Sequence, residues 1–119
     1  MTPPPAVTTL LPLPPATFHI LVSLGGTERH GYAIIQEVAH RTEGAVRLGA
    51  GTLYRSIQRM QEQGLIIESR KRPAPRDDDE RRRYYKLTPF GLVVMRAETA
   101  RLADMVRMAR ATGLVPRRA

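Results

Sequence analysis

The sequence predicts a mainly α-helical fold with a small β-hairpin wing (α+β), namely a winged helix-turn-helix followed by one C-terminal helix. Three observations lead to this prediction. Helical periodicity recurs in four segments, two short β-rich runs flank a proline-interrupted loop, and a Thr-Pro pair opens the last helical segment. The segments follow the order helix, helix, short strand, helix, strand, loop and strand, which is the order of a winged helix.

Size and composition indicate one small domain with an acidic partner. The chain has 119 residues, a hydrophobic fraction of 42% and a formal net charge of +8. Nearly all its basic residues are arginines, whose planar fork suits phosphate and guanine, although a GC-rich genome also produces an arginine bias. The absence of cysteine excludes disulfides and thiolate metal sites. With no secretion signal and no apolar run that spans a bilayer, we expect a cytoplasmic protein without membrane contact.

The first part of the chain is predicted to be an arm that leads into two helices. Repeated prolines predict that residues 1–13 form a flexible, Pro-rich arm. Pro14 and Pro15 can begin a helix because the first helical N–H needs no partner. This helix ends at the glycine pair 25–26, and a winged helix-turn-helix domain is predicted over 14–88.

The second helix is predicted to begin at His30 and to end near Thr42. Its periodicity places Tyr32 on a broad inward face. A stretch too short for more than a minimal strand, residues 46–48, separates it from the next helix.

The third helix is the candidate reader of nucleic acid. Leu53, Ile57 and Met60 recur at helical spacing and share one face, and Gly64 is placed to end the helix in a left-handed conformation. The polar face opposite is predicted to contact DNA, and an ordinary surface helix with solvated arginines is the alternative. The candidate DNA-binding residues are Thr52, Tyr54, Arg55, Gln58 and Arg59.

Within this set the individual roles differ. Arg55 or Arg59 is expected to read a base, for example through guanine O6 and N7. Tyr54 lies at the flank of the helix, where its hydroxyl could donate to a phosphate or its ring could pack against the first helix.

The predicted wing consists of strands at 65–72 and 82–87 around a charged loop at 73–80. Basic side chains on both strands suit phosphates beside a groove, whereas a solvated hairpin with internal ion pairs is the alternative. The candidate wing contacts are Arg70, Lys71, Arg72, Arg81, Arg82 and Arg83.

Thr88 and Pro89 predict the start of a C-terminal dimerisation helix over 89–113, which a loose basic tail at 114–119 follows. Apolar residues in this helix alternate steps of four and three, as in a helix packed along its length on another. Covering the domain's own first helix is the alternative role of this seam. The predicted dimer interface comprises Leu92, Met95, Thr99, Leu102, Val106 and Ala109.

Catalysis and metal binding are not expected. His19, His30 and His40 have no metal-ligand spacing, and the acidic run at 77–80 lies on a predicted loop tip. His30 is interpreted as a structural group at a helix start. The sequence therefore predicts no enzyme, no cofactor and no metal site.

Three groups of residues make the chain resemble the PadR family of transcriptional regulators. These are His30-Gly31-Tyr32 with Ile34, the run from Gly51-Thr52-Leu53-Tyr54 to Leu65-Ile66, and Arg83-Tyr84-Tyr85-Lys86-Leu87-Thr88 with Gly91. The similarity covers roughly 18–111. Two features depart from the family pattern, since Gly49 and Ala50 replace a common Ser-Pro and the chain has no Trp on which a ligand could stack.

The resemblance implies a short-form, homodimeric winged-helix repressor that binds double-stranded operator DNA and is released by a small-molecule effector of unknown identity. Two-fold symmetry would require a near-palindromic operator. A winged-helix protein-interaction module without specific DNA binding is the alternative from another class.

Overall fold

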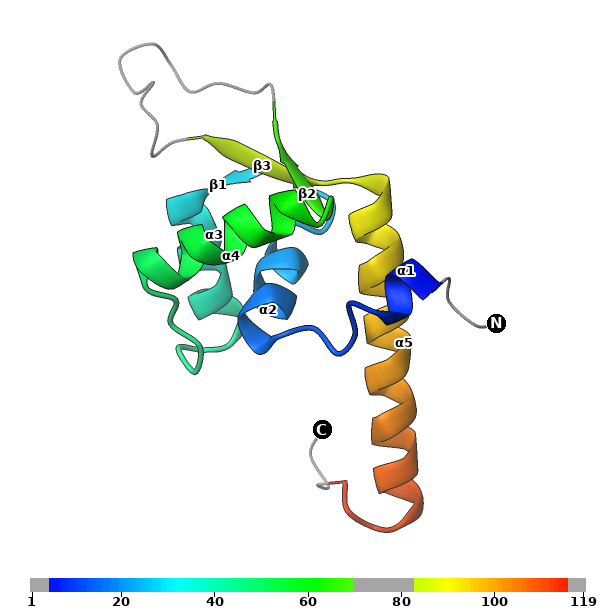
Figure 1. Cartoon of the computed structure of the whole chain (residues 1–119). Helices are drawn as coiled ribbons and strands as arrows, with labels where there is room; N and C mark the ends of the chain where they lie inside the picture. Colours follow the sequence, from blue (N-terminus) through cyan, green and yellow to red (C-terminus); the bar gives the residue numbers. More distant parts are fainter. Residues whose placement is uncertain (1–4, 70–82, 116–119) are drawn as a thin grey trace.

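The computed structural model describes residues 5–69 and 83–115, which hold five helices and three strands. Figure 1 shows α2, α3 and α4 grouped beneath a small sheet, while α5 packs beside them and projects away from the domain. The elements are α1 (Pro5–Thr8), α2 (Pro15–Ser23), β1 (Arg29–His30), α3 (Gly31–Arg41), α4 (Ala50–Glu62), β2 (Ile66–Glu68), β3 (Tyr84–Leu87) and α5 (Pro89–Ala111).

The sheet is antiparallel, with β3 between β1 and β2. Ile66 pairs with Leu87 at one end of the β2–β3 ladder, and Arg29 pairs with Tyr85 on the other side of β3. The predicted winged helix is confirmed, but the position of its short strand was wrong. Residues 46–48 form a loop, and the segment just before α3 pairs with the open edge of β3 instead.

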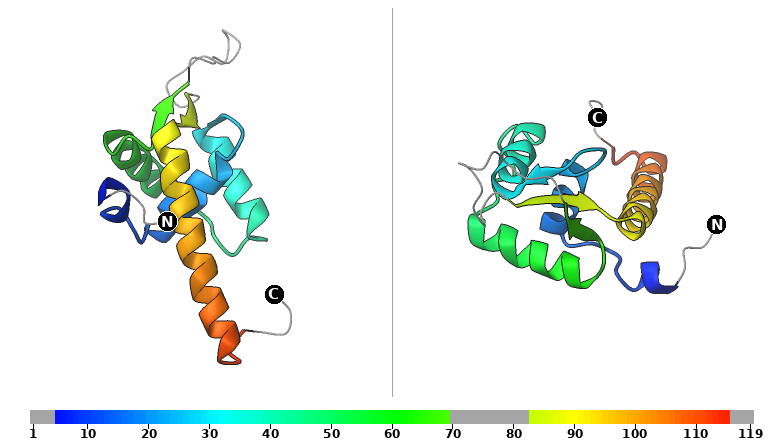
Figure 2. Two further views of the ribbon diagram at one scale, coloured as in Figure 1. Left: turned by 90° about the vertical axis from the view of Figure 1, so that its right-hand side faces the viewer. Right: turned by 90° about the horizontal axis from the view of Figure 1, so that it is seen from above.

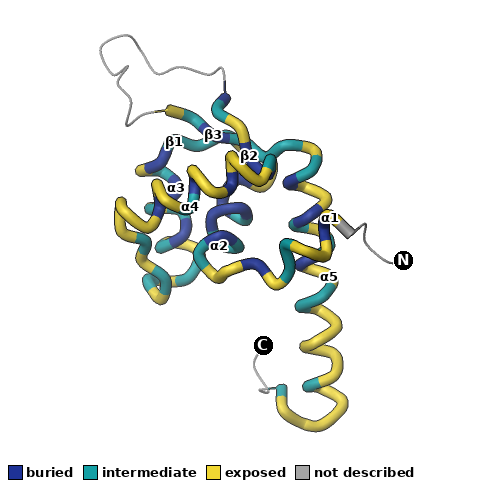
Figure 3. The backbone as a smooth tube through the Cα atoms, in the orientation of Figure 1, coloured by how far each residue is buried: buried dark blue, intermediate teal, exposed yellow. Residues whose placement is uncertain are grey.

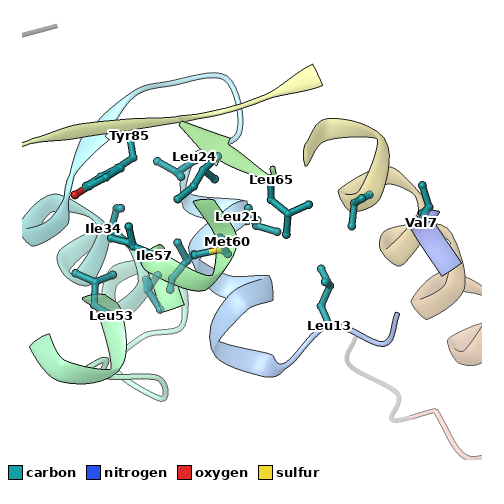
Figure 4. Packing of buried hydrophobic residues seen from close by; sticks show 14 residues of the cluster. Val7, Leu13, Leu21, Leu24, Ile34, Leu53, Ile57, Met60, Leu65 and Tyr85 are labelled. Atoms are coloured by element: carbon teal, nitrogen blue, oxygen red, sulfur yellow. The ribbon is translucent and has the colours of Figure 1, made fainter. Parts of the chain in front are cut away.

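The core lies where α2, α3 and α4 meet under the sheet, and Figure 4 shows its side chains converging from all four. Ile34 is fully buried on α3, but the inward placement of Tyr32 was wrong because its side chain is 62% exposed. Tyr85 reaches into the core from β3. Burial, with the carboxylate of Glu68 nearby, raises the pKa of the Tyr85 hydroxyl and so keeps it neutral.

The N-terminal segment packs on α5, so the prediction of a flexible arm was wrong for residues 5–13. Val7 is 1% exposed and Leu13 is 8% exposed, and Figure 2 shows α1 lying against α5. Prolines do exclude long regular structure here, but they do not prevent the apolar side chains between them from finding a partner surface.

A buried carboxylate fixes this segment to α5. Glu98 is 2% exposed, and its Oε2 accepts a hydrogen bond of 2.9 Å from the backbone N–H of Leu13. Arg101, one turn further along α5, donates to Oε1 at 2.6 Å and to Oε2 at 3.0 Å. These hydrogen bonds, chiefly those from Arg101, lower the pKa of Glu98 and keep it ionised despite its burial.

Replacing Glu98 with glutamine tests this connection. At neutral pH we expect Glu98→Gln to lower the free energy of unfolding by about 1–3 kcal/mol, because the negative charge opposite Arg101 is lost and one of the two acceptor oxygens is replaced by an NH2 group that cannot accept. The folded pKa lies below the ordinary value of 4.5. The stabilisation is therefore fully present above that value and is lost as the pH falls through the folded pKa.

Urea denaturation of wild type and variant over a pH series measures this difference. It should stay constant near neutral pH and shrink in acid. The control is Glu62→Gln on α4, because Glu62 is exposed and its loss should change stability by less than about 0.5 kcal/mol. A difference between wild type and Glu98→Gln that grows as the pH falls would contradict the ionised state inferred here.

The junction between the wing and α5 is closed by Thr88. Its side chain caps α5 by accepting from the N–H of Gly91 at 2.9 Å, as the sequence predicted, and its backbone N–H donates to the carbonyl of Leu65 at 3.0 Å. Its hydroxyl also donates to the carbonyl of Gly64. The same threonine thus ties the start of α5 to the turn that follows α4.

Candidate nucleic-acid interface

Helix α4 has the two faces that its sequence predicted. Leu53, Ile57 and Met60 are at most 2% exposed and pack into the core. The opposite face is open to solvent along the length of the helix, which lies on the surface of the domain in Figure 1. All five candidate DNA-binding residues of this helix are exposed, namely Thr52, Tyr54, Arg55, Gln58 and Arg59.

Backbone conformation sets both ends of α4. Gly49 stands at the N-cap in an extended conformation and provides no side-chain cap. At the other end Gly64 has a φ of 77°, and the N–H of Leu65 closes the helix by donating to Met60 at 2.9 Å. Glycine is favoured at this point because the backbone is left-handed. This conformation turns the chain directly into β2.

Arg55 and Arg59 project from the exposed face without carboxylate partners in the part of the chain that the structure describes. Some arginines elsewhere in the domain are engaged, for example Arg29 and Arg41. Arg41 contacts Glu37 at 2.7 Å, and Arg29 donates to the carbonyl of Ser23 at 2.7 Å. Two unpaired guanidinium groups one turn apart form a concentrated positive charge suited to phosphate or to base edges.

Tyr54 sits at the flank of this face and is 37% exposed. Its hydroxyl lies 2.6 Å from the position that a Cβ on Gly31 would occupy. The ring therefore packs over the start of α3, and the absence of a side chain at Gly31 makes that approach possible. Of the two roles open for Tyr54, packing is visible here, against the second helix of the domain rather than the first.

The wing is described only at its base, where β2 and β3 pair. Arg83 is exposed and its Nε lies 3.6 Å from Glu68 Oε1, which is an internal ion pair of the kind expected for a solvated hairpin. The remaining predicted wing contacts lie outside the described residues, as does the loop at 73–80. These are Arg70, Lys71, Arg72, Arg81 and Arg82.

The predicted dimer seam is largely open to solvent. Figure 3 shows the distal half of α5 exposed over nearly its whole circumference. Val106 is 49% exposed and Leu92 is 39% exposed, while Met105 and Met108 beside the seam are 50% and 59% exposed. Thr99 is exposed, and Met95, Leu102 and Ala109 are partly buried. Another face of α5 is buried within the domain itself, through Gly91, Val94 and Glu98.

Other kinds of site find no support within the described ranges. They contain no group of three or more His, Asp or Glu side chains placed to hold a metal ion. His30 is confirmed as a helix cap, since its Nδ1 accepts from the N–H of Ala33 at 3.1 Å. Over the same residues no helix is both long and apolar enough to cross a membrane.

Sequence reasoning missed four polar residues that the fold buries, namely Thr17, Ser23, Ser69 and Glu98. It assigns no role to Glu98 on α5 or to Thr17 on α2, but both are less than 10% exposed. An acid placed between Val94 and Leu102 at helical spacing was the available signal for Glu98. No comparable signal marks Thr17.

Comparison with known proteins agrees with the winged-helix fold. A family model described as "Transcriptional regulator PadR-like family" matches residues 20–97. The transcriptional regulator Rv3488 of Mycobacterium tuberculosis is 28% identical over 89 residues, which cover 75% of this chain and 77% of that protein.

Solved structures share the fold. A PadR-like transcriptional regulator from Bacillus cereus superimposes with a TM-score of 0.66 at 19% identity, over 92% of this chain and 97% of that one. PadR from Bacillus subtilis, in complex with operator DNA, superimposes with a TM-score of 0.60 at 17% identity, over 72% of this chain and 47% of that one. At such identities the likeness establishes the winged-helix fold and nothing finer.

Proposed function

The chain belongs to the PadR-like family of transcriptional regulators, and from this premise we propose that it is a homodimeric repressor of a near-palindromic operator, released by a small ligand. It is a regulator rather than an enzyme. The observation that carries the proposal is the outward face of α4, where Arg55 and Arg59 stand unpaired among the described residues on a helix whose other face is anchored in the core.

In the proposed mechanism α4 enters the major groove and the wing follows the adjacent phosphates. An α-helix fits the major groove, where guanine presents two acceptors to an arginine fork. Phosphate contacts by the wing would fix the register without reading sequence. The operator complex of Bacillus subtilis PadR supports DNA as the partner.

Dimerisation through α5 would set the distance between two copies of α4. The exposed apolar side chains of its distal half, among them Val106 and Met108, would be covered by the same helix of a second copy. A two-fold arrangement places the half-sites about 10 bp apart. A ligand would then release the operator by favouring a dimer in which the two α4 helices no longer match that spacing.

Binding to the DNA upstream of its own gene tests the function directly. We expect the purified protein to bind that DNA more tightly than random DNA, with affinity falling steeply as salt rises. Weak, salt-insensitive binding without preference would instead favour the rival function, a winged-helix module that contacts only proteins.

The role of α4 is tested by removing each arginine. Arg55→Ala and Arg59→Ala should each weaken operator binding by about 1–3 kcal/mol while the fold is retained. If the replaced arginine reads a base, the variant should lose affinity for the operator alone. If it holds a phosphate, the variant should lose affinity for operator and random DNA alike. Titration of both DNAs at fixed salt measures these losses, and Arg107→Ala on exposed α5 is the control. Unchanged operator affinity in both variants would exclude α4 as the reader.

A further inference from the structure

A depression of about 430 Å³ separates the start of α2 from the exposed face of α4. Ala16 and Thr17 line it from α2, together with Pro14 at the N-cap of that helix. Arg55 and Arg59 line it from α4, with the hydroxyl residues Thr52 and Ser56 between them. None of the lining residues is acidic, so the depression carries two positive charges and no negative one.

Two residues of the first turn of α2, Ala16 and Thr17, line this space and carry backbone N–H groups. In the described parts of the chain the N–H groups of Ala16 and Thr17 make no hydrogen bond. Pro14 at the N-cap has no side-chain acceptor that could cap them. Free N–H groups and the positive end of the helix dipole make such a terminus attractive to an anion.

The Thr17 side chain is a second feature, independent of the helix N-terminus, that indicates a ligand. It is 6% exposed, yet within 5–69 and 83–115 its hydroxyl has no hydrogen-bond partner. No completely enclosed side-chain N or O lacks a partner in that part of the chain, so this hydroxyl reaches the solvent of the depression that Thr17 lines. A nearly buried hydroxyl directed at an open, positively charged hollow is poorly satisfied by protein alone.

We propose that this depression binds one phosphate group, held by the N–H groups of Ala16 and Thr17, the Thr17 hydroxyl and an arginine of α4. In the proposed function, on which this assignment rests, the group is a phosphodiester of the DNA backbone beside the groove that α4 enters. The core packing of α2 against α4 then makes the phosphate contact a fixed reference for the position of α4. The same donors suit a phosphate group on a free small molecule, so the experiment separates the two sources.

Ala16→Asp places a carboxylate among the donors. Near a helix N-terminus an acid stabilises the helix, whereas it repels a phosphate bound there. We therefore expect an unchanged or higher Tm together with at least about tenfold weaker binding to both operator and random duplexes. Thr27→Asp makes the same charge change at the exposed turn after α2 and should bind DNA like wild type.

Thr17→Val removes the hydroxyl and keeps the shape of the side chain. It should weaken duplex binding by about tenfold, the effect of one hydrogen bond to a charged group, whereas Thr17→Ser, which keeps the hydroxyl, should retain the affinity. In the absence of DNA, inorganic phosphate should shift the amide NMR signals of Ala16 and Thr17 in wild type, and these shifts should be lost in Ala16→Asp.

Duplex binding and phosphate binding test separate parts of the proposal. Loss of both in Ala16→Asp and Thr17→Val supports the site and its DNA source. Loss of phosphate binding with wild-type duplex affinity overturns the DNA source and assigns the site to a free phosphate compound. Wild-type behaviour of both variants in both measurements overturns the site while the proposed function stands. Wild-type protein that binds no duplex overturns the proposed function, and phosphate binding still decides the site.

Discussion

Gly91→Ala is expected to destabilise the fold by about 2–4 kcal/mol and to lower the Tm by roughly 10–15 °C. A Cβ at this position would overlap the carbonyl oxygen of Leu65 and approach its carbonyl carbon to 2.9 Å. Both atoms belong to the backbone, so no side-chain rotation can relieve the overlap. Alanine favours a helix over glycine by only about 1 kcal/mol, which is too little to offset it.

The only relief is a shift of α5 away from the turn before β2. Such a shift would strain the bonds that Thr88 makes to Gly64 and Leu65. Thermal unfolding followed by circular dichroism measures the loss. Gly51→Ala is the matched control, because Gly51 lies in exposed helix with only the flexible Arg55 side chain nearby; its Tm should be equal or higher. A Gly91→Ala protein as stable as wild type would show that α5 is not held this close to Leu65.

The helices were predictable where local signals and burial agree. In α4 the spacing of Leu53, Ile57 and Met60 and the terminal Gly64 act together, and the structure has each as expected. The strand at Arg29–His30 was missed because two residues carry no periodicity, and their pairing depends on the distant β3. The packing of residues 5–13 was missed for a related reason, since the Leu13–Glu98 contact joins residues 85 positions apart.

Part of the candidate site could be predicted from the sequence, and part depends on contacts between distant residues. The exposed face of α4 follows from its own helical periodicity, so Arg55 and Arg59 could be named from sequence. The depression beside it could not, because it exists only where α2 packs against α4 and brings Thr17 opposite these arginines. Contact of either set with DNA stays a prediction until binding is measured.

Leu102→Asp with Val106→Asp should abolish the dimer and reduce operator binding far beyond the loss of any single contact. In the isolated chain Val106 is 49% exposed and Leu102 is partly buried. Replacing the pair should therefore cost the single domain little folding free energy. A dimer would bury both beside their symmetry mates and gain about 25 cal/mol for each Å² of apolar surface covered. Four carboxylates in that seam would repel one another and cost several kcal/mol in desolvation.

Light scattering and operator titration at equal protein concentration test this expectation together. Arg107→Gln with Arg110→Gln is the matched control, since it lowers the net charge by the same two units at exposed positions of α5. The control should remain dimeric, whereas the Asp pair should yield a folded monomer with wild-type helical content. Each monomer can occupy only one half-site, so the affinity gained by linking two readers is lost. Wild-type protein that is monomeric at tens of micromolar, and that binds its operator one-to-one, would contradict both the α5 dimer and the spacing mechanism that depends on it.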